Sequence, residues 1–440
     1  MKISNILAIS LLSITIIFLA YGVERTESLW LLGSFSIAFL SYGFLNFKNE
    51  NSFTNVKTVL TIGILIRVVL VFVVPNLSDD FYRFVWDGRL LNHGINPFLE
   101  LPSYYIEQHL HSDFLTADLY ENLNSQNYYT VYPPVLQAVF GVATFLFPKS
   151  IFGSIVVMKT FLLLFEIGSI VLIMRLLKHF KMPKENVLLY ALNPVVILEI
   201  VGSIHFEGAM IYFSLLAIWL LVREKWHLSS LSISVAIVAK LLPLMFLPFL
   251  LKRLRWRSIP YYIAVAGAVI LLFIPLLNEA FITNISESVE LYFNSFEYNG
   301  SIYYILRWIG YETVGYNWIS IISPYLTLSI FVIVMLAALR VKERGQRYFA
   351  QNMLFALTVF YLLATTVHPW YITSMVAFGA LTRFRYPMIW SGLIFFTYIN
   401  YGYEPFRENL AIVTIEYVIL FGMIGLELFS KYRSSKKTSI

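Results

Sequence analysis

A run of acidic, basic and aromatic residues near position 80 carries the clearest chemical signal in the sequence. It follows directly on an apolar stretch and reads Ser78-Asp79-Asp80-Phe81-Tyr82-Arg83-Phe84-Val85-Trp86-Asp87-Gly88-Arg89. In a helix Asp80, Arg83 and Asp87 would share one face, and Asp79 would reach the same arginine from four residues away. A carboxylate held beside a cation at a membrane surface can take the proton of a hydroxyl group. A solvated, salt-bridged loop helix would have the same residues, because surface ion pairs are common.

A second set of polar residues falls at the ends of later apolar runs. His205 and Glu207 lie at one such end, and His368, Trp370 and Tyr371 lie at another. A His-x-Glu pair with a further histidine and an acid could hold a divalent cation, but this spacing matches no metal-binding signature. Hydrogen-bonded histidines and aromatic residues of a membrane interface show the same pattern. We therefore treat these residues as candidate ligand contacts and assign no metal ligand.

The composition excludes several classes of protein. The chain has 440 residues, of which 58% are hydrophobic, 17% aromatic and 13% charged, with a mean hydropathy of +0.71. Soluble domains carry about 25% charged residues, so a soluble globular protein, a disordered protein and a nucleic-acid-binding protein are all excluded. The chain contains no cysteine, which excludes disulfides, thiolate catalysis and cysteine-ligated metals.

The elements that must position these residues are membrane-spanning helices, because a helix needs about 20 apolar residues to cross a bilayer. The apolar runs predict spans at 3–21, 29–46, 57–75, 155–177, 186–202, 207–222, 259–277, 318–340, 348–367, 386–403 and 409–430. Residues 228–251 predict a hairpin of two short helices with Lys240 near its tip, and 370–383 predict one short helix. The expected fold is an all-α polytopic transmembrane bundle of about 13–14 crossings, formed by residues 1–440 as a single domain.

The distribution of basic residues predicts the topology. Cytoplasmic loops are rich in Lys and Arg. If 134–148 is an interfacial or re-entrant helix that does not cross, the segments on the cytoplasmic side hold 23 of the 32 Lys and Arg residues. These segments are Lys2, 48–57, 175–184, 223–227, 252–257, 340–347, 383–385 and the C-terminal tail. Both termini are then cytoplasmic, and two long segments, 76–133 and 278–317, lie on the outer face. We call them the first and second outer segments and expect both to be folded.

Short motifs continue along the chain after the acidic run. They are Gly94-Ile95-Asn96-Pro97-Phe98, Tyr129-Thr130-Val131-Tyr132-Pro133-Pro134, Asn193-Pro194, His205-Phe206-Glu207-Gly208, Lys240-Leu241-Leu242-Pro243 and His368-Pro369-Trp370-Tyr371. In order and spacing, these motifs and the acidic run resemble the GT-C superfamily of integral-membrane glycosyltransferases. They resemble more closely the branch that uses polyprenyl-phosphate mannose or a related lipid-linked hexose. The resemblance covers roughly residues 57–375.

The resemblance implies a definite reaction. Such enzymes place an essential aspartate in the first large outer loop, where it acts as the base on the acceptor hydroxyl. The sugar then leaves its lipid phosphate with inversion. Here the expected base is Asp80, with Asp79 as the second candidate, since some relatives have an Asp-x-Asp pattern and this chain has adjacent acids. The expected function is transfer of a hexose, with mannose as the expected sugar, from polyprenyl phosphate to an acceptor on the outer face.

The same chemistry indicates which other residues contact the substrates. A lipid phosphate is an activated, anionic leaving group, so the site needs cations that hold it. The candidate cations are Lys240, Arg307, Arg83 and Lys159. The candidates for contact with the sugar or acceptor are His205, Glu207, His368, Trp370, Tyr371 and Tyr132. No cofactor is firmly implied, and a divalent cation is the one considered. The expected partners are the polyprenyl-phosphate-linked sugar, a glycan, lipid or protein acceptor and membrane lipid, without nucleic acid.

Other roles and other functions compete with this interpretation. Arg67 within a span could pair with Glu166 or Glu199, and Lys159 could extend to the headgroups. A flippase or secondary transporter is an alternative function, and it would show related halves with broken helices at mid-membrane. A glycan ligase that uses a diphosphate-linked donor is another. The gathering of polar residues at one face favours an enzyme, and donor identity distinguishes the transferase from the ligase.

Overall fold

The structure is a computed structural model of the 440-residue chain, and it describes residues 2–47, 55–341, 345 and 347–437. Within these residues every regular element is a helix, and the β-type pairing is limited to an isolated bridge between Tyr298 and Thr366. The predicted all-α helical bundle is therefore confirmed. Parts of three predicted cytoplasmic segments (48–57, 340–347 and the C-terminal tail) lie outside the described residues.

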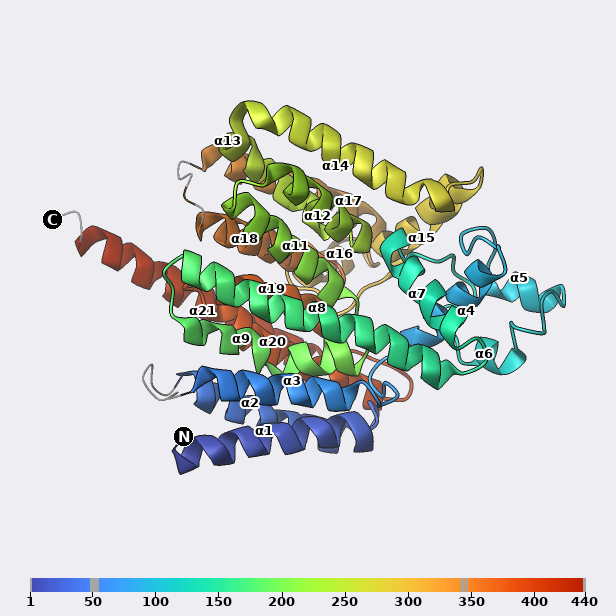
Figure 1. The fold of residues 1–440 in the computed structure, drawn as a ribbon, viewed down its shortest axis with the longest axis horizontal. Helices are drawn as coiled ribbons and strands as arrows, with labels where there is room; N and C mark the ends of the chain where they lie inside the picture. Colours follow the sequence, from blue (N-terminus) through green and yellow to red (C-terminus); the bar gives the residue numbers. More distant parts are fainter. Residues whose placement is uncertain (1, 48–54, 342–344, 346, 438–440) are drawn as a thin grey trace.

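Three apolar helices open the fold and pack together, as Figure 1 shows: α1 (Ile3–Gly22), α2 (Ser28–Phe47) and α3 (Val56–Leu70). They correspond to the first three predicted spans, although α3 ends before the predicted residue 75. The N-terminus of α3 is capped by Asn55, whose side-chain oxygen accepts a hydrogen bond from the backbone N–H of Thr58.

The first outer segment and the helix after it gather at one end of the bundle (Figure 1). Their helices are α4 (Asp80–Asn92), α5 (Pro102–Glu107), α6 (Ala117–Glu121) and α7 (Pro134–Leu146). α4 packs closely on α7, and Gly88 permits this approach, because a Cβ atom there would lie 2.4 Å from the carbonyl oxygen of Phe140. α7 has 13 residues and lies at this end in Figure 1, and its not crossing the membrane stays a prediction.

α8 (Ile151–His179) runs back along the bundle, and a bent pair of helical segments follows it. The pair consists of η1 (Lys184–Asn186), α9 (Val187–Ala191), α10 (Pro194–Val196) and the π-helix η2 (Ile197–Gly202). Its two halves meet at 53°. Pro194 cannot continue the hydrogen bonds of α9, and the Asn193 side chain caps the second half by accepting from two backbone N–H groups. The predicted span 186–202 is thus one broken helix.

The predicted hairpin at 228–251 forms within the middle of the chain. The elements here are α11 (Glu207–Val222), α12 (Trp226–Ala239), η3 (Leu242–Leu250), α13 (Leu251–Leu254), η4 (Arg255–Arg257), α14 (Ser258–Phe273) and η5 (Ile274–Leu276). Lys240 lies between α12 and η3, at the turn of the hairpin as predicted.

The second outer segment and the C-terminal helices complete the bundle. They are α15 (Phe281–Ser295), α16 (Ile302–Val314), α17 (Ile319–Arg340), α18 (Arg347–Leu363), η6 (Pro369–Tyr371), α19 (Ile372–Ala380), α20 (Tyr386–Ile394), η7 (Phe395–Gly402) and α21 (Leu410–Lys437). Both outer segments are folded, in agreement with their predicted character.

Six described helices are long and apolar enough to cross a membrane, and the bent pair makes a seventh candidate. Four shorter apolar helices, Pro134–Leu146, Glu207–Val222, Trp226–Ala239 and Tyr348–Leu363, fall below the length used for this count. These findings describe a multi-pass membrane protein. The number of crossings, which the sequence puts at 13–14, stays a prediction because it depends on the shorter helices.

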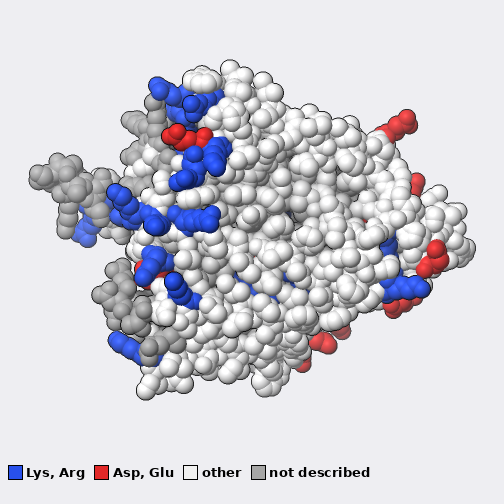
Figure 2. Space-filling view, in the orientation of Figure 1, with Lys and Arg blue, Asp and Glu red and all other residues white. Residues whose placement is uncertain are grey.

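The charged side chains separate along the bundle axis. Figure 2 shows Lys and Arg gathered at the end where α1 begins and α21 ends, while acidic side chains appear mainly toward the end formed by α4–α7. This asymmetry follows the basic count made from the sequence. The candidate residues of the acidic run lie at the less basic end.

Candidate active site

The acidic run forms the N-terminus of α4, where two adjacent aspartates have different surroundings. Asp79 precedes the helix and forms an ion pair with Arg25 from the α1–α2 connection. Asp80 is the first helical residue, and its Oδ1 accepts a hydrogen bond from the Asn124 side chain at 2.7 Å. The positive end of the helix dipole favours a carboxylate at this position. No ion pair reaches Asp80 within the described part of the chain, so its carboxylate is the one left available for chemistry.

A buried network behind Asp80 holds α4 in place. Arg83 donates from Nε to Asp87 Oδ1 at 2.7 Å and from Nη1 to the carbonyl oxygen of Tyr128 at 2.8 Å. Asp87 is fully buried, and its Oδ2 also accepts from Thr130 at 2.6 Å and Gln137 at 2.9 Å. The network joins α4, α7 and the loop between them. It serves as a scaffold that fixes the start of α4.

This network corrects one prediction from the sequence. Helical spacing predicted that Asp79 would reach Arg83, but Arg83 pairs with Asp87 and Asp79 pairs with Arg25. The reason is that α4 begins at Asp80, so Asp79 lies outside the helical register on which the i, i+4 rule depends. Asp80 is oriented by Asn124 rather than by the shared helix face. The Arg83 guanidinium faces the packed interior, away from any position open to a phosphate.

Lys240 and Glu207 form a second charged pair, which joins the hairpin tip to the start of α11. The Lys240 ammonium contacts Glu207 Oε1 and lies 4.1 Å from the ring centroid of Tyr371. Glu207 is buried, whereas the Lys240 side chain remains 31% exposed. Partial exposure leaves the ammonium able to bind a further anion. The structure therefore brings together three sequence-predicted residues from α11, the hairpin and η6.

Both predicted histidines stack on the same tryptophan. The ring of Trp370 lies between His205, at a centroid distance of 4.1 Å, and His368, at 4.3 Å, with both pairs nearly parallel. The ring of Tyr298 stacks on the other side of His368 at 4.7 Å. Burial and the nearby charges of His205 and Lys240 lower the pKa of His368 to about 3, so this imidazole is neutral near pH 7.

The stack is attached to the second outer segment by backbone hydrogen bonds. The Tyr298 N–H donates to the Thr365 carbonyl at 3.1 Å, and the Val367 N–H donates to the Tyr298 carbonyl at 2.8 Å. The Tyr298 hydroxyl donates to the Thr397 carbonyl at 3.1 Å. Tyr298 thus connects three parts of the chain: the second outer segment, the loop that precedes η6, and the helix η7. Tyr298 was not among the site residues predicted from the sequence.

Two further candidates lie in different surroundings. Arg307 pairs with Glu297 at 2.7 Å and lies over the Tyr304 ring at 4.0 Å, within the second outer segment. Tyr132 packs edge-on against Phe84 and Phe140. Burial first, and then the charge of Asp80, raise the pKa of the Tyr132 phenol well above its ordinary value, so it stays protonated. The effect of the Asp80 charge places Tyr132 near the acidic site.

Two cations within the predicted spans, Arg67 and Lys159, have protein partners in the structure. Arg67 donates to Glu166 at 3.0 Å and to the Ala191 carbonyl at 2.7 Å, so of the two acids considered from the sequence Glu166 is its partner. Lys159 is buried and donates to three backbone carbonyls, those of Leu70, Val73 and Gly202. An ammonium has three N–H groups, and all three are used here. Lys159 therefore holds helix ends together and does not extend to the headgroups.

Several residues near the site carried no signal in the sequence. Arg25, Asn124 and Tyr401 belong to this group, because each meets the acidic pair or its partners only after folding. The Arg25 guanidinium lies 5.1 Å from the Tyr401 ring centroid. Arg25 could have been suspected, because it stands outside the predicted cytoplasmic segments.

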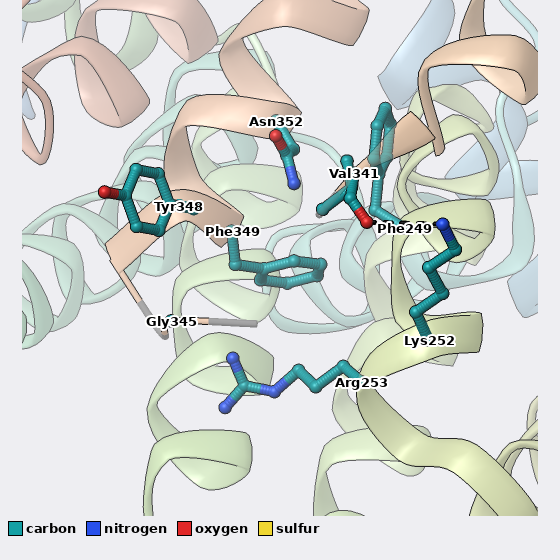
Figure 3. A pocket seen from close by; sticks show the side chains of 8 residues that line it. All are labelled: Phe249, Lys252, Arg253, Val341, Gly345, Tyr348, Phe349 and Asn352. Atoms are coloured by element: carbon teal, nitrogen blue, oxygen red, sulfur yellow. Dashed lines mark hydrogen bonds between the residues drawn. The ribbon is translucent and has the colours of Figure 1, made fainter. Parts of the chain in front are cut away.

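The described residues contain no group of three or more His, Cys, Asp or Glu side chains placed to hold a metal ion. A small pocket lies far from the acidic run, near the basic end, and Figure 3 shows the residues that line it: Phe249, Lys252, Arg253, Val341, Gly345, Tyr348, Phe349 and Asn352. Its free volume of about 20 Å³ is close to that of one water molecule, so it cannot hold a sugar.

Comparison with known proteins identifies the family. The family model described as alpha-(1->6)-mannopyranosyltransferase, N-terminal domain (MptA_B family), matches residues 5–254, which is more than half of the chain. The matched region contains the acidic pair, His205, Glu207 and Lys240. No curated protein and no solved structure matches the chain. The chain belongs to this family of mannosyltransferases, and it is a multi-pass membrane glycosyltransferase of the GT-C type.

Proposed function

We propose that this member of the alpha-(1->6)-mannopyranosyltransferase family transfers mannose from a polyprenyl phosphate to an acceptor hydroxyl on the outer face of the membrane. The observation that carries the proposal is the unequal state of the two aspartates. Asp79 is neutralised by Arg25, whereas Asp80 accepts one hydrogen bond from Asn124 and has no cation beside it among the described residues. An acid in that state can accept the proton of the attacking hydroxyl.

The reaction proceeds with inversion in this proposal. The acceptor oxygen attacks the anomeric carbon from the face opposite the phosphate, and its proton passes to Asp80. The bond between the anomeric carbon and the phosphate oxygen breaks, and the phosphate keeps the electron pair. A positioned base contributes about 10²–10⁴-fold to such a step. Asp79 supports Asp80 by fixing the start of α4 to Arg25.

Lys240 is the proposed cation for the donor phosphate. Its ammonium is partly exposed, and its contacts with Glu207 and the Tyr371 ring hold it in one place. Arg307 is a secondary candidate, since its pair with Glu297 lies farther along the second outer segment. The donors of Arg83 and Lys159 are taken by protein acceptors, so we leave both out of this role.

The aromatic residues would hold the sugar. Trp370 and Tyr371 offer apolar faces that suit the C–H face of a hexose, and His368 and Tyr132 offer polar atoms beside them. The placement of this site on the outer face rests on the charge asymmetry of Figure 2 and on the positive-inside rule. Both termini would then be cytoplasmic.

A panel of purified donors tests the reaction. The full chain in detergent is given polyprenyl-phosphate mannose, other polyprenyl-phosphate hexoses, a diphosphate-linked glycan and GDP-mannose, with a mannoside acceptor. Transfer from the monophosphate-linked mannose supports the proposal. Transfer from GDP-mannose without lipid donor would contradict it, and use of the diphosphate-linked donor would favour a ligase. Lys240→Ala should weaken donor use about ten- to hundredfold, as expected for one lost charge-assisted contact.

The face of the membrane is tested by single-cysteine labelling, which is clean because the chain has no cysteine. Asn127→Cys lies in the first outer segment, and Arg433→Cys lies near the end of α21; both positions are exposed. An impermeant thiol reagent added outside intact cells should modify the cysteine at 127 and spare the one at 433. The reverse pattern would place the acidic site on the cytoplasmic face.

A further inference from the structure

His205 has one ring nitrogen fixed by the protein and the other without a protein partner. Its Nδ1 lies 3.0 Å from the backbone carbonyl oxygen of Glu199 and 3.1 Å from the Oε2 atom of the same residue. Both atoms are acceptors, so Nδ1 must carry a proton. His205 is 4% exposed, and its Nε2 has no hydrogen-bond partner within the described residues. A polar atom buried in this way calls for a partner that the protein does not supply.

The direction of Nε2 is fixed by the residues around the ring. Glu199 lies on η2, and its Oε1 accepts a hydrogen bond from the Tyr398 hydroxyl at 2.9 Å. Trp370 covers one face of the imidazole at an interplanar angle of 11°. Ile204 adopts a φ of 59°, which is unfavourable for a β-branched residue and brings His205 back toward Glu199. The strained turn and the stacking together hold the ring in one orientation.

The charges around His205 favour its protonated form. Burial lowers the pKa of the imidazole, but the hydrogen bond and charge of Glu199, with the charges of Glu207 and Asp80, outweigh burial, so the net pKa is raised above its ordinary value. Two further groups face it. His368 is neutral near pH 7, and Lys240 is held by Glu207. The ring is therefore placed to carry a positive charge at its Nε2–H.

We propose that Glu199 and His205 form a dyad that directs an Nε2–H donor at the phosphate of the lipid-linked donor. In this assignment, which rests on the proposed function, Glu199 is a positioning residue and His205 contacts the leaving group. As the bond between the anomeric carbon and the phosphate oxygen breaks, the oxygen keeps the electron pair and accepts the hydrogen bond from Nε2–H. The acceptor proton passes to Asp80, and the imidazolium keeps its own proton.

A binding experiment without turnover tests the dyad. The probe is farnesyl methyl phosphate, a diester with one negative charge throughout pH 5–9, and the neutral alcohol farnesol is the control ligand. Binding of farnesyl methyl phosphate to the purified full chain should weaken, which means a larger Kd, as the pH rises through the pKa of His205. Glu199→Gln removes the charge of Glu199, which contributes most to raising this pKa, while the charges of Glu207 and Asp80 remain, so the weakening should move to lower pH. His205→Gln should bind roughly tenfold less tightly at pH 6 and lose the pH dependence.

Matched variants separate the dyad from general packing. Tyr398→Phe removes the other contact of Glu199 and should leave the pH midpoint unchanged. Asp80→Asn should keep phosphodiester binding, because the base does not hold the phosphate. If Glu199→Gln does not fold, the comparison of His205→Gln with the parent protein still decides the result.

Three outcomes overturn the proposal or separate it from the proposed function. If His205→Gln binds the diester like the parent protein while turnover falls, Nε2 serves the acceptor and the proposal is wrong. If binding is independent of pH in the parent protein and in Glu199→Gln, the dyad is only structural and the proposal is wrong. If pH-dependent diester binding persists but no polyprenyl-phosphate sugar is used, the dyad stands and the proposed donor fails.

Discussion

The two outer segments hold their charged residues in different ways. In the first (76–133), Arg83 and Asp87 are almost completely buried, and Asp87 accepts hydrogen bonds from three side chains. In the second (278–317), the Glu297–Arg307 pair keeps 27% and 17% of its side-chain surface exposed. Removing one partner of a buried ion pair is strongly destabilising, whereas an exposed ion pair contributes little to stability. The first segment is therefore a rigid platform for the acidic site.

The second outer segment is joined to the bundle by hydrogen bonds around Tyr298 and Asn299. The backbone bridge at Tyr298 attaches it to the loop before η6, and Glu408 accepts hydrogen bonds from the Asn299 N–H at 2.6 Å and from the Tyr304 hydroxyl. We infer that this segment covers the aromatic stack and adjusts more easily than the first. Substitutions in the two segments should then differ in kind: lost chemistry or lost folding in the first, and moderate changes in the second.

The largest effect is expected at Asp80, the proposed base in the first outer segment. Asp80→Asn is nearly isosteric and removes the proton acceptor, so turnover should fall by at least about a hundredfold with normal folding and donor binding. Steady-state rates with the lipid donor, beside a thermal unfolding curve, measure this. Asp79→Asn, the matched control, should lose less, because it removes only the contact with Arg25. If Asp79→Asn abolished turnover and Asp80→Asn left it normal, Asp79 and not Asp80 would be the base.

The next largest effect is a loss of stability, expected when the buried acid Asp87 is substituted and compared with the partly exposed acid Glu297. Asp87→Asn leaves the buried Arg83 charge unpaired and should lower the free energy of unfolding by roughly 3–5 kcal/mol. Glu297→Gln in the second segment should cost less than Asp87→Asn, because the Glu297 carboxylate is partly exposed and its donors Tyr303 and Asn317 can still bond to the amide oxygen. Thermal unfolding in detergent, followed by circular dichroism, measures both variants under the same conditions. If the two substitutions destabilised the protein equally, the first outer segment would not be more rigidly held than the second.

A smaller effect is expected where the second segment meets the site. Tyr298→Ala removes the ring that stacks on His368, and aromatic pairs contribute about 0.5–1.5 kcal/mol, so turnover should fall about two- to tenfold. Tyr298→Phe keeps the ring and removes only the hydroxyl bonded to the Thr397 carbonyl. This variant should retain most of the activity. Equal losses in the two variants would show that the hydroxyl, and not the ring, supports His368.

The smallest expected effect is a pH dependence of the second segment. Burial raises the pKa of the Glu408 carboxyl from 4.5 to about 7. The folded protein therefore binds this proton more tightly than the unfolded chain does, and stability should fall as the pH rises from about 4.5 to about 7. The change should be of order 1 kcal/mol, because partial exposure screens the charge. Melting temperatures between pH 5 and 8 measure it, and Glu408→Gln should flatten the profile. An unchanged profile in that variant would assign the dependence to another group.

Much of the fold was predictable because it depends on local properties of the chain. Apolar length predicted the apolar helices and the hairpin with Lys240 at its turn, but not the outer-segment helices α5, α6, α15 and α16. The cost of an unpaired charge in a span indicated that Arg67 could pair with Glu166 or Glu199, and the structure pairs it with Glu166. The motifs predicted the family, which the comparison with the mannosyltransferase model confirms. None of these predictions requires knowledge of which helices are neighbours.

The partners of the charged site residues were decided only by the tertiary structure. Helical spacing placed Asp79, Asp80 and Asp87 within reach of Arg83, but Asp79 precedes α4, and the α1–α2 connection brings Arg25 to it instead. Glu199 reaches His205 because the π-helix and the Ile204 turn fold back on each other. Such contacts depend on where helices begin and how they pack, and one residue of register changes the partner of a side chain. The sequence by itself determined which residues are ionisable and which stretches are apolar enough to form helices. Packing decided which ionisable residues are paired and which remain available for chemistry.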